Sequence, residues 1–443
     1  MSDVSTRSIT WGAAGLITLF AIEYIAVGTA MPSVARDLDG LALYSLAFGA
    51  TVATSVVGMM VSGWWSDHSG PKPVLLTGCL SFAGGLLLAG LAPTMELFVV
   101  GRGLQGWGSG LATVSIYVII AQGVPDERRP ALFSMLAAAW VIPGLAGPVL
   151  TGVVVEQWGW RWVFLGVIPL VLVALIVIWP ALRKTRPSDD AAYLKVSTLL
   201  WAGVAALSAA VLNVLAEDIA GWRAVLAVPM VMLLLLASSH LLPAGTLRLV
   251  PGLPSVIAAR GAIGASFIAA EAYLPLMLQE IHGYSPAWAG AILAVGSVTW
   301  TVGSWAQSKL ADRAGRNELL VHGSVIILIG LASLVLALGV DSPGWTVLAI
   351  WGWTSAGVGL AYPITSLLTL RLSPESEVGK NSSSLQVSEA LASAGVLALS
   401  GAAFGFFYAT SPQTAFVSVA VVSALAGGVA VATAKRTRTT VSV

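Results

Sequence analysis

Residues 63–72 read Gly-Trp-Trp-Ser-Asp-His-Ser-Gly-Pro-Lys, and residues 308–316 read Ser-Lys-Leu-Ala-Asp-Arg-Ala-Gly-Arg. Both segments contain an aspartate, two further residues and a glycine, and a cation stands nearby: Asp67 and Gly70 in the first, Asp312 and Gly315 in the second. A single copy of this pattern is no more than good turn chemistry. Two copies, 245 residues apart (67 to 312), indicate an internal repeat.

Composition places the repeat in a membrane protein, because 57% of the residues are hydrophobic and only 10% are charged. Apolar runs of about 20 residues can each cross a bilayer as a helix whose backbone groups are bonded internally. Such runs occur at 11–34, 42–65, 73–93, 97–122, 131–155, 162–182, 196–216, 223–243, 253–278, 285–307, 319–340, 345–370, 385–408 and 414–434. The sequence therefore predicts an all-α polytopic protein with fourteen transmembrane helices.

Lysine and arginine positions give an independent check on this count, because short cytoplasmic loops retain them. With the N-terminus inside the cell, the outer loops hold only Arg36, Arg161 and Arg223 of the 22 cations, and Arg102 and Arg260 lie within spans. The remaining 17 fall in cytoplasmic segments. We therefore expect a multi-pass protein of the cell (inner) membrane with both termini in the cytoplasm.

The two copies of the loop pattern are separated by eight predicted spans. This spacing fits a six-helix bundle over 11–182, a linker with two additional helices over 183–252, and a second six-helix bundle over 253–434. Many transporters are built from such repeats and bind substrate near the midplane between the halves. The sequence therefore favours transport.

Several other classes of function lack support. The net charge of +1 comes with no basic patch, so we expect no nucleic-acid partner. We find no metal-ligand spacing, phosphate-binding loop or nucleophile motif, and Cys79 is the single cysteine. We therefore expect neither an enzyme nor a bound cofactor or metal, and an ion gradient as the source of energy. The expected partners are protons, lipid and a small organic substrate, and the protein is expected to be a monomer.

Four motifs resemble those of the major facilitator superfamily, specifically its fourteen-helix drug:proton antiporter branch. The first is the loop that begins at Gly63, where His68 and Pro71 replace the more usual basic residues. Its second copy ends at Arg316. The resemblance implies that the loop residues Gly63, Asp67, Gly70, Asp312, Gly315 and Arg316 take part in conformational change.

The other three motifs lie within predicted spans. Residues 102–108, Arg-Gly-Leu-Gln-Gly-Trp-Gly, resemble the helix-four motif, and Glu23 precedes Pro32 by nine residues, as an aspartate does in the first-helix motif of this branch. Residues 143–152 resemble the antiporter motif, with Pro143 and Thr151 in place of the more usual glycine. Gly144, Gly147, Pro148 and Gly152 give this helix a face without bulk, which permits either a bendable seal or ordinary close packing.

Glu23 lies in an otherwise apolar span, where a charge is costly. Desolvation disfavours the charged carboxylate, so Glu23 is a candidate for proton uptake and release and for substrate binding. The alternative is a structural carboxylate that accepts hydrogen bonds from the hydroxyls of Tyr24 or Thr29. Tyr24 is also a candidate substrate contact.

Arg102 needs a partner on a neighbouring helix, because a guanidinium does not lose its proton. By the resemblance it modulates proton transfer, and Gln105 is placed one turn away to hydrogen-bond to substrate. A purely structural arginine is an equal alternative.

Glu271 is the rough counterpart of Glu23 in the second half, and we expect it to serve in proton coupling and substrate binding. Arg260 lies three helical turns earlier on nearly the same face. Its charge is explained either by a partner or by snorkelling to the membrane surface.

Gln386 and Glu389 form a further polar pair at i, i+3, and we list both as weaker substrate-binding candidates near the membrane boundary. Among the tryptophans, Trp140 and Trp300 lie away from the span ends, where ring faces can bind organic cations or face lipid. The leading hypothesis is a proton-coupled exporter of hydrophobic or cationic organic compounds. The alternative is a transporter of a lipid or endogenous metabolite in the same fold.

Overall fold

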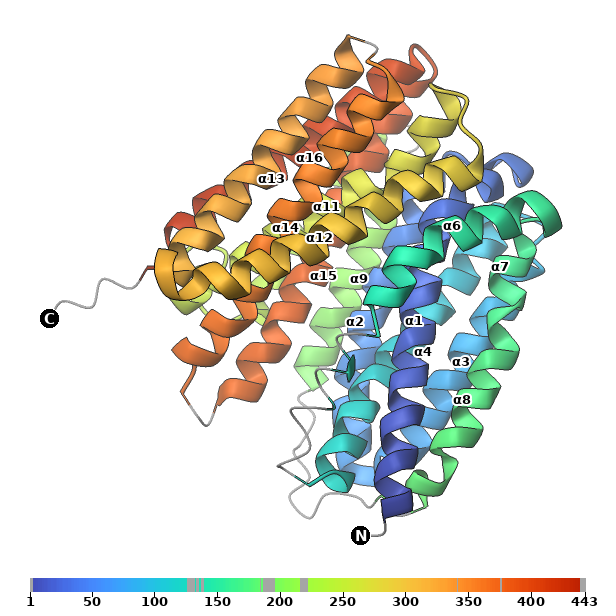
Figure 1. Cartoon of the computed structure of the whole chain (residues 1–443), viewed down its shortest axis with the longest axis vertical. Helices are drawn as coiled ribbons and strands as arrows, with labels where there is room; N and C mark the ends of the chain where they lie inside the picture. The colour runs from blue at the N-terminus through green and yellow to red at the C-terminus, as the bar shows by residue number, and fades with distance from the viewer. Residues whose placement is uncertain are drawn as a thin grey trace, which may run out of the picture. The chain divides into compact units, whose positions relative to one another are not determined.

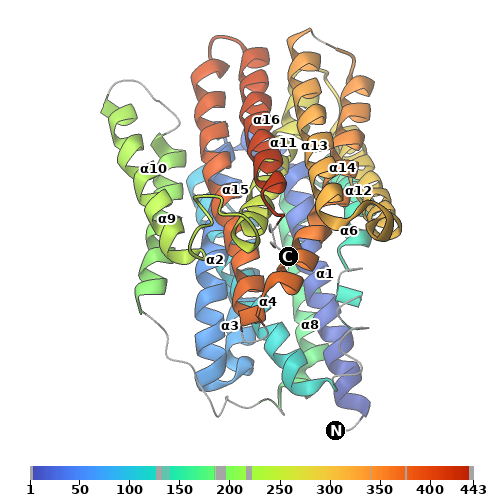
Figure 2. The ribbon, with the colours of Figure 1, turned by 90° about the vertical axis from the view of Figure 1, so that its left-hand side faces the viewer.

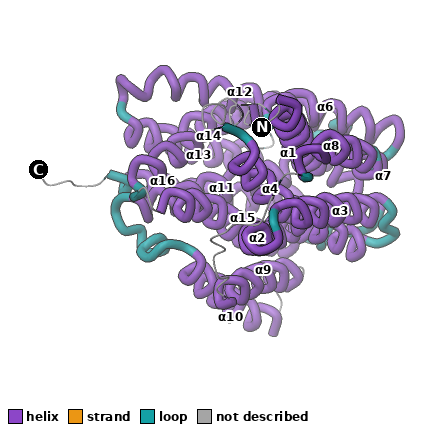
Figure 3. Tube along the Cα trace, turned by 90° about the horizontal axis from the view of Figure 1, so that it is seen from below, coloured by secondary structure: helices purple, strands orange, loops and turns teal. Residues whose placement is uncertain are grey.

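The computed structural model describes residues 3–125, 132, 135–136, 139–183, 185, 196–215, 222–340, 342–374 and 377–438. Every regular element within these ranges is a helix, as predicted (Figure 3). Eleven of these helices are long and apolar enough to cross a membrane. The chain is therefore an all-helical, multi-pass membrane protein.

Three of the fourteen predicted spans are not among those eleven. The spans at 196–216 and 223–243 correspond to α9 (Val196–Leu215) and α10 (Trp222–Leu241), whose apolar stretches are shorter. The span at 131–155 lies partly outside the described residues. Fourteen crossings remain a prediction.

Contacts within the chain divide it into two compact units. The first contains Met1–Ala206 and Pro286–Gly290, and the second contains Leu207–Ser285 and Ala291–Val443. The three-part division expected from the sequence remains a prediction.

The first unit is organised around the glycine-rich helix α4. It contains α1 (Asp3–Asp37), α2 (Tyr44–Ser69), α3 (Pro71–Gly90), α4 (Met95–Gly123), α6 (Val141–Trp158), α7 (Arg161–Leu165) and α8 (Val167–Leu182). Helix α4 packs against α2 and α3, and α1 packs against α6 and α8 (Figure 1). A Cβ atom at Gly108 would collide with the backbone of Phe82 on α3, and one at Gly110 with Ser55 on α2. Glycine therefore lets α4 approach both neighbours closely.

The second unit is organised around α11. Its main helices are α10, α11 (Leu253–Glu280), α12 (Pro286–Ala314, whose first five residues belong to the first unit), α13 (Arg316–Gly339), α14 (Gly344–Leu372), α15 (Val378–Tyr408) and α16 (Pro412–Lys435). Helix α11 packs against α15 and α16, and the three lie side by side in Figure 2. Helix α13 packs against α14 and α16.

The two repeated loops have the same backbone conformation. Gly70 has φ 79° and ψ 159°, and Gly315 has φ 75° and ψ 142°. Positive φ with extended ψ is essentially restricted to glycine. In each loop a helix begins at the next residue, α3 at Pro71 and α13 at Arg316. The repeat therefore exists in backbone geometry as well as in sequence, although the side chain of Asp312 lies outside what the structure describes.

Candidate functional site

Glu23 of α1 and Arg102 of α4 form a buried ion pair in the first unit, in which Arg102 Nη1 donates to Glu23 Oε1. Only 5% of the Glu23 side chain and 2% of the Arg102 side chain are exposed. The pair supplies the partner that Arg102 required from a neighbouring helix. It also offsets the cost of burying either charge alone.

Arg102 has two further, neutral acceptors. Its Nη1 donates to Gln105 Oε1 on the same helix, and its Nε donates to the carbonyl oxygen of Ala47 on α2 at 3.2 Å. Arg102 therefore keeps two hydrogen bonds if Glu23 takes up a proton. The other end of the Gln105 amide, Nε2, is buried and has no hydrogen-bond partner among the described residues.

The other candidates of the first unit lie around this pair. The Thr29 hydroxyl does not satisfy Glu23, because it is itself buried without a partner in the described part of the chain. Tyr24 and Trp140, which are far apart in sequence, make an edge-to-face contact with ring centroids 6.0 Å apart. Both rings are partly exposed.

The small-residue face of α6 is in close contact with its neighbours. A Cβ atom at Gly147 would lie 3.5 Å from Ile25 of α1, and one at Gly152 would lie 2.6 Å from the backbone nitrogen of Ala287. Gly144 and Pro148 are buried. Bulk at Gly152 would therefore push α6 away from residues 286–290 of the same unit. A role of this face in sealing or bending remains a prediction.

Arg260 of α11 and Glu389 of α15 form the corresponding ion pair of the second unit. Arg260 Nε donates to Glu389 Oε2 at 2.8 Å, and 7% of the arginine and 25% of the glutamate side chain are exposed. Snorkelling therefore does not explain Arg260, whose head is held inside the unit. Glu389 lies inside α15, and its place near the membrane boundary remains a prediction.

Tyr362 of α14 completes this cluster, and sequence reasoning missed it. Its hydroxyl contacts both carboxylate oxygens of Glu389 at 2.8 Å, and the Arg260 guanidinium carbon lies 3.4 Å from the centroid of its ring. A tyrosine within an apolar span was an available signal, because a buried hydroxyl needs a hydrogen-bond partner.

Aromatic rings adjoin Tyr362. Trp300 of α12 makes an edge contact with Tyr362 at 5.3 Å and with Phe267 of α11 at 5.4 Å, between ring centroids. Phe267 in turn stacks on Trp351 of α14 at 4.6 Å. We call Phe267, Trp300 and Trp351 the aromatic wall.

Gln386 is brought into the cluster, whereas Glu271 is not. Gln386 Oε1 accepts a hydrogen bond from Arg260 Nη2 at 3.4 Å. Glu271 is half-buried, and among the described residues it has neither an ion-pair nor a hydrogen-bond partner. Its proposed roles in proton coupling and substrate binding remain predictions, and the structure does not pair it with Arg260.

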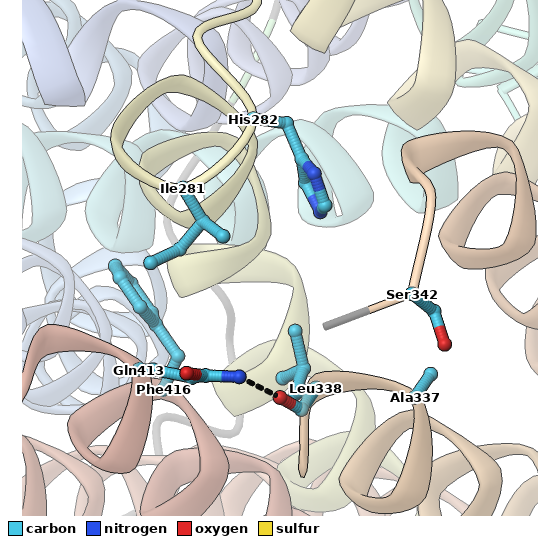
Figure 4. Close-up of a pocket in the computed structure, with 7 residues that line it drawn as sticks. All are labelled: Ile281, His282, Ala337, Leu338, Ser342, Gln413 and Phe416. Carbon is cyan, nitrogen blue, oxygen red and sulfur yellow. Dashed lines mark hydrogen bonds between the residues drawn. The ribbon is translucent and has the colours of Figure 1, made fainter. Parts of the chain in front are cut away.

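A small cavity lies at one end of the second unit, away from all of these residues (Figure 4). It is shallow and open to solvent, and it is lined by Ile281, His282, Ala337, Leu338, Ser342, Gln413 and Phe416. The Gln413 side chain donates to the carbonyl of Leu338 at 2.6 Å across one side of it. No candidate substrate residue lines this cavity.

Comparison with known proteins relates the chain to transporters. A family model described as Major Facilitator Superfamily matches residues 13–397. The MFS-type transporter ppz2 of Metarhizium majus is 24% identical over 79% of this chain, which spans only 64% of that relative. The multidrug transporter protein MdtP of Bacillus subtilis is 24% identical over 84% of this chain and 70% of its own.

Solved structures share the fold. The crystal structure of a D-xylose-proton symporter has a TM-score of 0.66 at 18% identity and covers 95% of this chain and 96% of its own. At this identity the similarity concerns the fold alone.

Proposed function

Because the chain belongs to the Major Facilitator Superfamily, we propose that this membrane transporter exports hydrophobic or cationic organic compounds by proton-coupled antiport. Similarity to the multidrug transporter protein MdtP supports the substrate class. The proposal includes alternating access between two six-helix bundles and fourteen crossings, with both termini in the cytoplasm. It also includes an inner-membrane location and a monomeric protein.

The buried pair of Glu23 and Arg102 is the observation that carries the proposed proton coupling. A proton that reaches Glu23 neutralises the carboxylate and opens the ion pair. Arg102 then stays in place, because Gln105 and the Ala47 carbonyl still accept its hydrogen bonds. Release of the proton on the other side of the membrane restores the pair.

This arrangement links the charge of Glu23 to the contact between two helices of the first unit, α1 and α4. The pair joins α1 to α4, so its opening removes a charged contact between two helices that otherwise pack mainly against other neighbours. A cationic substrate favours the carboxylate, whereas a proton removes its charge. A bound cationic substrate and a proton therefore favour opposite charge states of Glu23, which is the requirement for exchange.

Replacement of Glu23 by glutamine tests the proposal in proteoliposomes that contain the full chain. We expect Glu23→Gln to reduce accumulation of a cationic dye under an imposed pH gradient by at least about tenfold, because the amide does not carry the transported proton. Glu318→Gln is the matched control, since Glu318 is an exposed acid in the second unit. Undiminished pH-driven accumulation by Glu23→Gln would refute Glu23 as the coupling site.

A substrate screen in the same vesicles tests the substrate class. Cationic dyes are compared with lipids and with neutral metabolites, each under the same pH gradient. We expect concentration of the dyes. Concentration of a lipid or neutral metabolite in their place would assign the chain to a different substrate class within the same fold.

A further inference from the structure

The cluster of the second unit contains the elements of a site for organic cations. Such sites combine a carboxylate with the face of an aromatic ring, because both attract positive charge when water is displaced. Glu389 and Tyr362 supply this combination, and the Tyr362 hydroxyl orients the carboxylate at 2.8 Å. We call these two residues the cation box.

The cation box is already occupied by the protein's own cation. The guanidinium carbon of Arg260 lies 3.4 Å from the Tyr362 ring centroid, and Arg260 Nε is 2.8 Å from Glu389 Oε2. An arginine stacked on a ring and paired with a carboxylate uses the same two attractions, charge pairing and cation–π contact, that would hold an organic ammonium or phosphonium ion, and it adds a hydrogen bond that a phosphonium ion does not make.

Arg260 also has alternative acceptors outside the box. Its Nη1 lies 3.3 Å from the hydroxyls of both Thr365 and Ser366, and its Nη2 lies 3.4 Å from Gln386 Oε1. These hydrogen bonds are longer than the 2.8 Å bond to Glu389. A modest shift of the guanidinium would tighten them, so Arg260 can leave the box without losing all its partners.

The exposure of Glu389 favours a ligand-binding role over a purely structural ion pair. A quarter of the Glu389 side chain is exposed, whereas Arg260 is almost fully covered. Tyr362 is half-buried and meets the edge of Trp300, the half-buried member of the aromatic wall. A ligand that reaches Glu389 therefore finds the half-buried rings of Tyr362 and Trp300 beside the charge, whereas the other two rings of the aromatic wall are buried.

We propose that Glu389 and Tyr362 bind aromatic organic cations and that Arg260 is an internal competitor, which occupies this site until substrate displaces it. The inference rests on the proposed function, because it specifies a site for the proposed substrates. Competition of this kind weakens equilibrium binding. It also gives the transporter a means of release, since the return of Arg260 expels the cation.

Equilibrium binding to the purified full chain tests the site without any gradient. The probe is tetraphenylphosphonium in detergent at pH 8, measured by equilibrium dialysis. We expect Arg260→Gln to bind it about tenfold more tightly than the unsubstituted chain, because the competitor is gone. We expect Glu389→Gln to bind at least about tenfold more weakly, because the carboxylate is lost.

Two further variants keep the result interpretable. Arg438→Gln, which removes an exposed cation of the same unit, is expected to leave the dissociation constant unchanged. Arg260→Lys retains a charge and so protects folding, but it loses the planar fork, and we expect it to tighten binding by less than Arg260→Gln. If Arg260→Gln does not fold, Arg260→Lys decides alone, and binding no tighter than that of the unsubstituted chain overturns the competitor.

The outcomes also separate this inference from the proposed function. If the unsubstituted chain binds no tetraphenylphosphonium, both the site and the proposed substrate class fail. If it binds the probe and accumulates it under a pH gradient, but Glu389→Gln retains full affinity or Arg260→Gln binds no more tightly, the inference fails and the proposed function stands.

Discussion

The two compact units each hold an arginine–glutamate pair, but they place the charges on different helices. In the first unit the acid is on α1 and the arginine on α4, whereas in the second the arginine is on α11 and the acid on α15. The Glu23 side chain is 5% exposed and that of Glu389 is 25% exposed. A sealed pair suits exchange of a proton, and a partly open pair suits exchange of a larger cation.

The backbone, in contrast, is repeated closely between the units. Gly70 and Gly315 share one unusual conformation, and a close glycine contact joins the second and fourth helices of each repeat. Gly106 of α4 lies against Thr51 of α2, and Gly359 of α14 lies against Trp300 of α12. The loop conformation and the close glycine contact are therefore the same in the two repeats, whereas the helices that carry the charged residues differ.

Removal of either buried arginine should cause the largest loss of stability, and the loss should differ between the two units. Loss of Arg102 leaves Glu23 buried without a cation, which costs about 3–5 kcal/mol of unfolding free energy. Loss of Arg260 costs less, because Glu389 reaches solvent and keeps the Tyr362 hydroxyl. We expect Arg102→Gln to lower the midpoint of thermal unfolding in detergent further than Arg260→Gln does.

The double variant Glu23→Gln, Arg102→Gln is the control for this prediction. It removes the buried charge that Arg102→Gln strands, so it should recover part of the lost stability. Equal losses for Arg102→Gln and Arg260→Gln would show that exposure of the acid does not distinguish the two pairs.

The two units share a close contact of a helix glycine with the backbone of a neighbouring helix. A Cβ atom at Gly106 would overlap the Thr51 carbonyl oxygen, and one at Gly359 would overlap the Trp300 carbonyl oxygen. Backbone cannot yield as a flexible side chain can, so we expect Gly106→Ala and Gly359→Ala each to cost about 1–3 kcal/mol. Thermal unfolding of the purified chain measures both.

Gly63 provides the matched control, because a Cβ atom there would meet nothing within 4 Å and the residue lies inside α2. Alanine is the better helix former, so Gly63→Ala should leave stability unchanged or raise it by up to about 1 kcal/mol. A cost at only one of Gly106 and Gly359 would mean that the close contact is not equivalent in the two repeats.

Much of this architecture was predictable from the sequence. Apolar length predicts helices, and the two copies of the loop pattern predict a repeat, because both depend on local chemistry. Burial cost alone singled out Glu23 and Arg102, and it required a partner for the arginine. It did not say that the two residues, 79 positions apart, would be partners of each other.

The second unit was harder to predict, for a physical reason. Arg260 and Glu389 are 129 positions apart, and their contact depends on how α11 packs against α15. Symmetry with Glu23 pointed to Glu271, which has no partner in the described residues, while Tyr362 drew no attention because its polar atom is a single hydroxyl. A charged residue in an apolar span predicts that some partner must be present, but it does not identify which side chain that partner is.

The smallest effects should come from the exposed ion pairs. Asp37 pairs with Arg161 in the first unit at 2.8 Å, and Glu318 pairs with Arg438 in the second at 2.7 Å. Each partner is at least two-fifths exposed, so water and salt screen both pairs. We expect Asp37→Asn and Glu318→Gln each to change unfolding free energy by less than about 1 kcal/mol.

Asp37→Asn should have the larger effect of the two, because Asp37 also accepts a hydrogen bond from Trp160 at 3.0 Å and Arg161 stacks on that ring. Thermal unfolding at low and high salt measures the difference, and the effect of Glu318→Gln should vanish at high salt. A loss at either exposed pair as large as that of Arg102→Gln would contradict the ranking. The energetic distinction would then lie in the position of a pair within its unit and not in its burial.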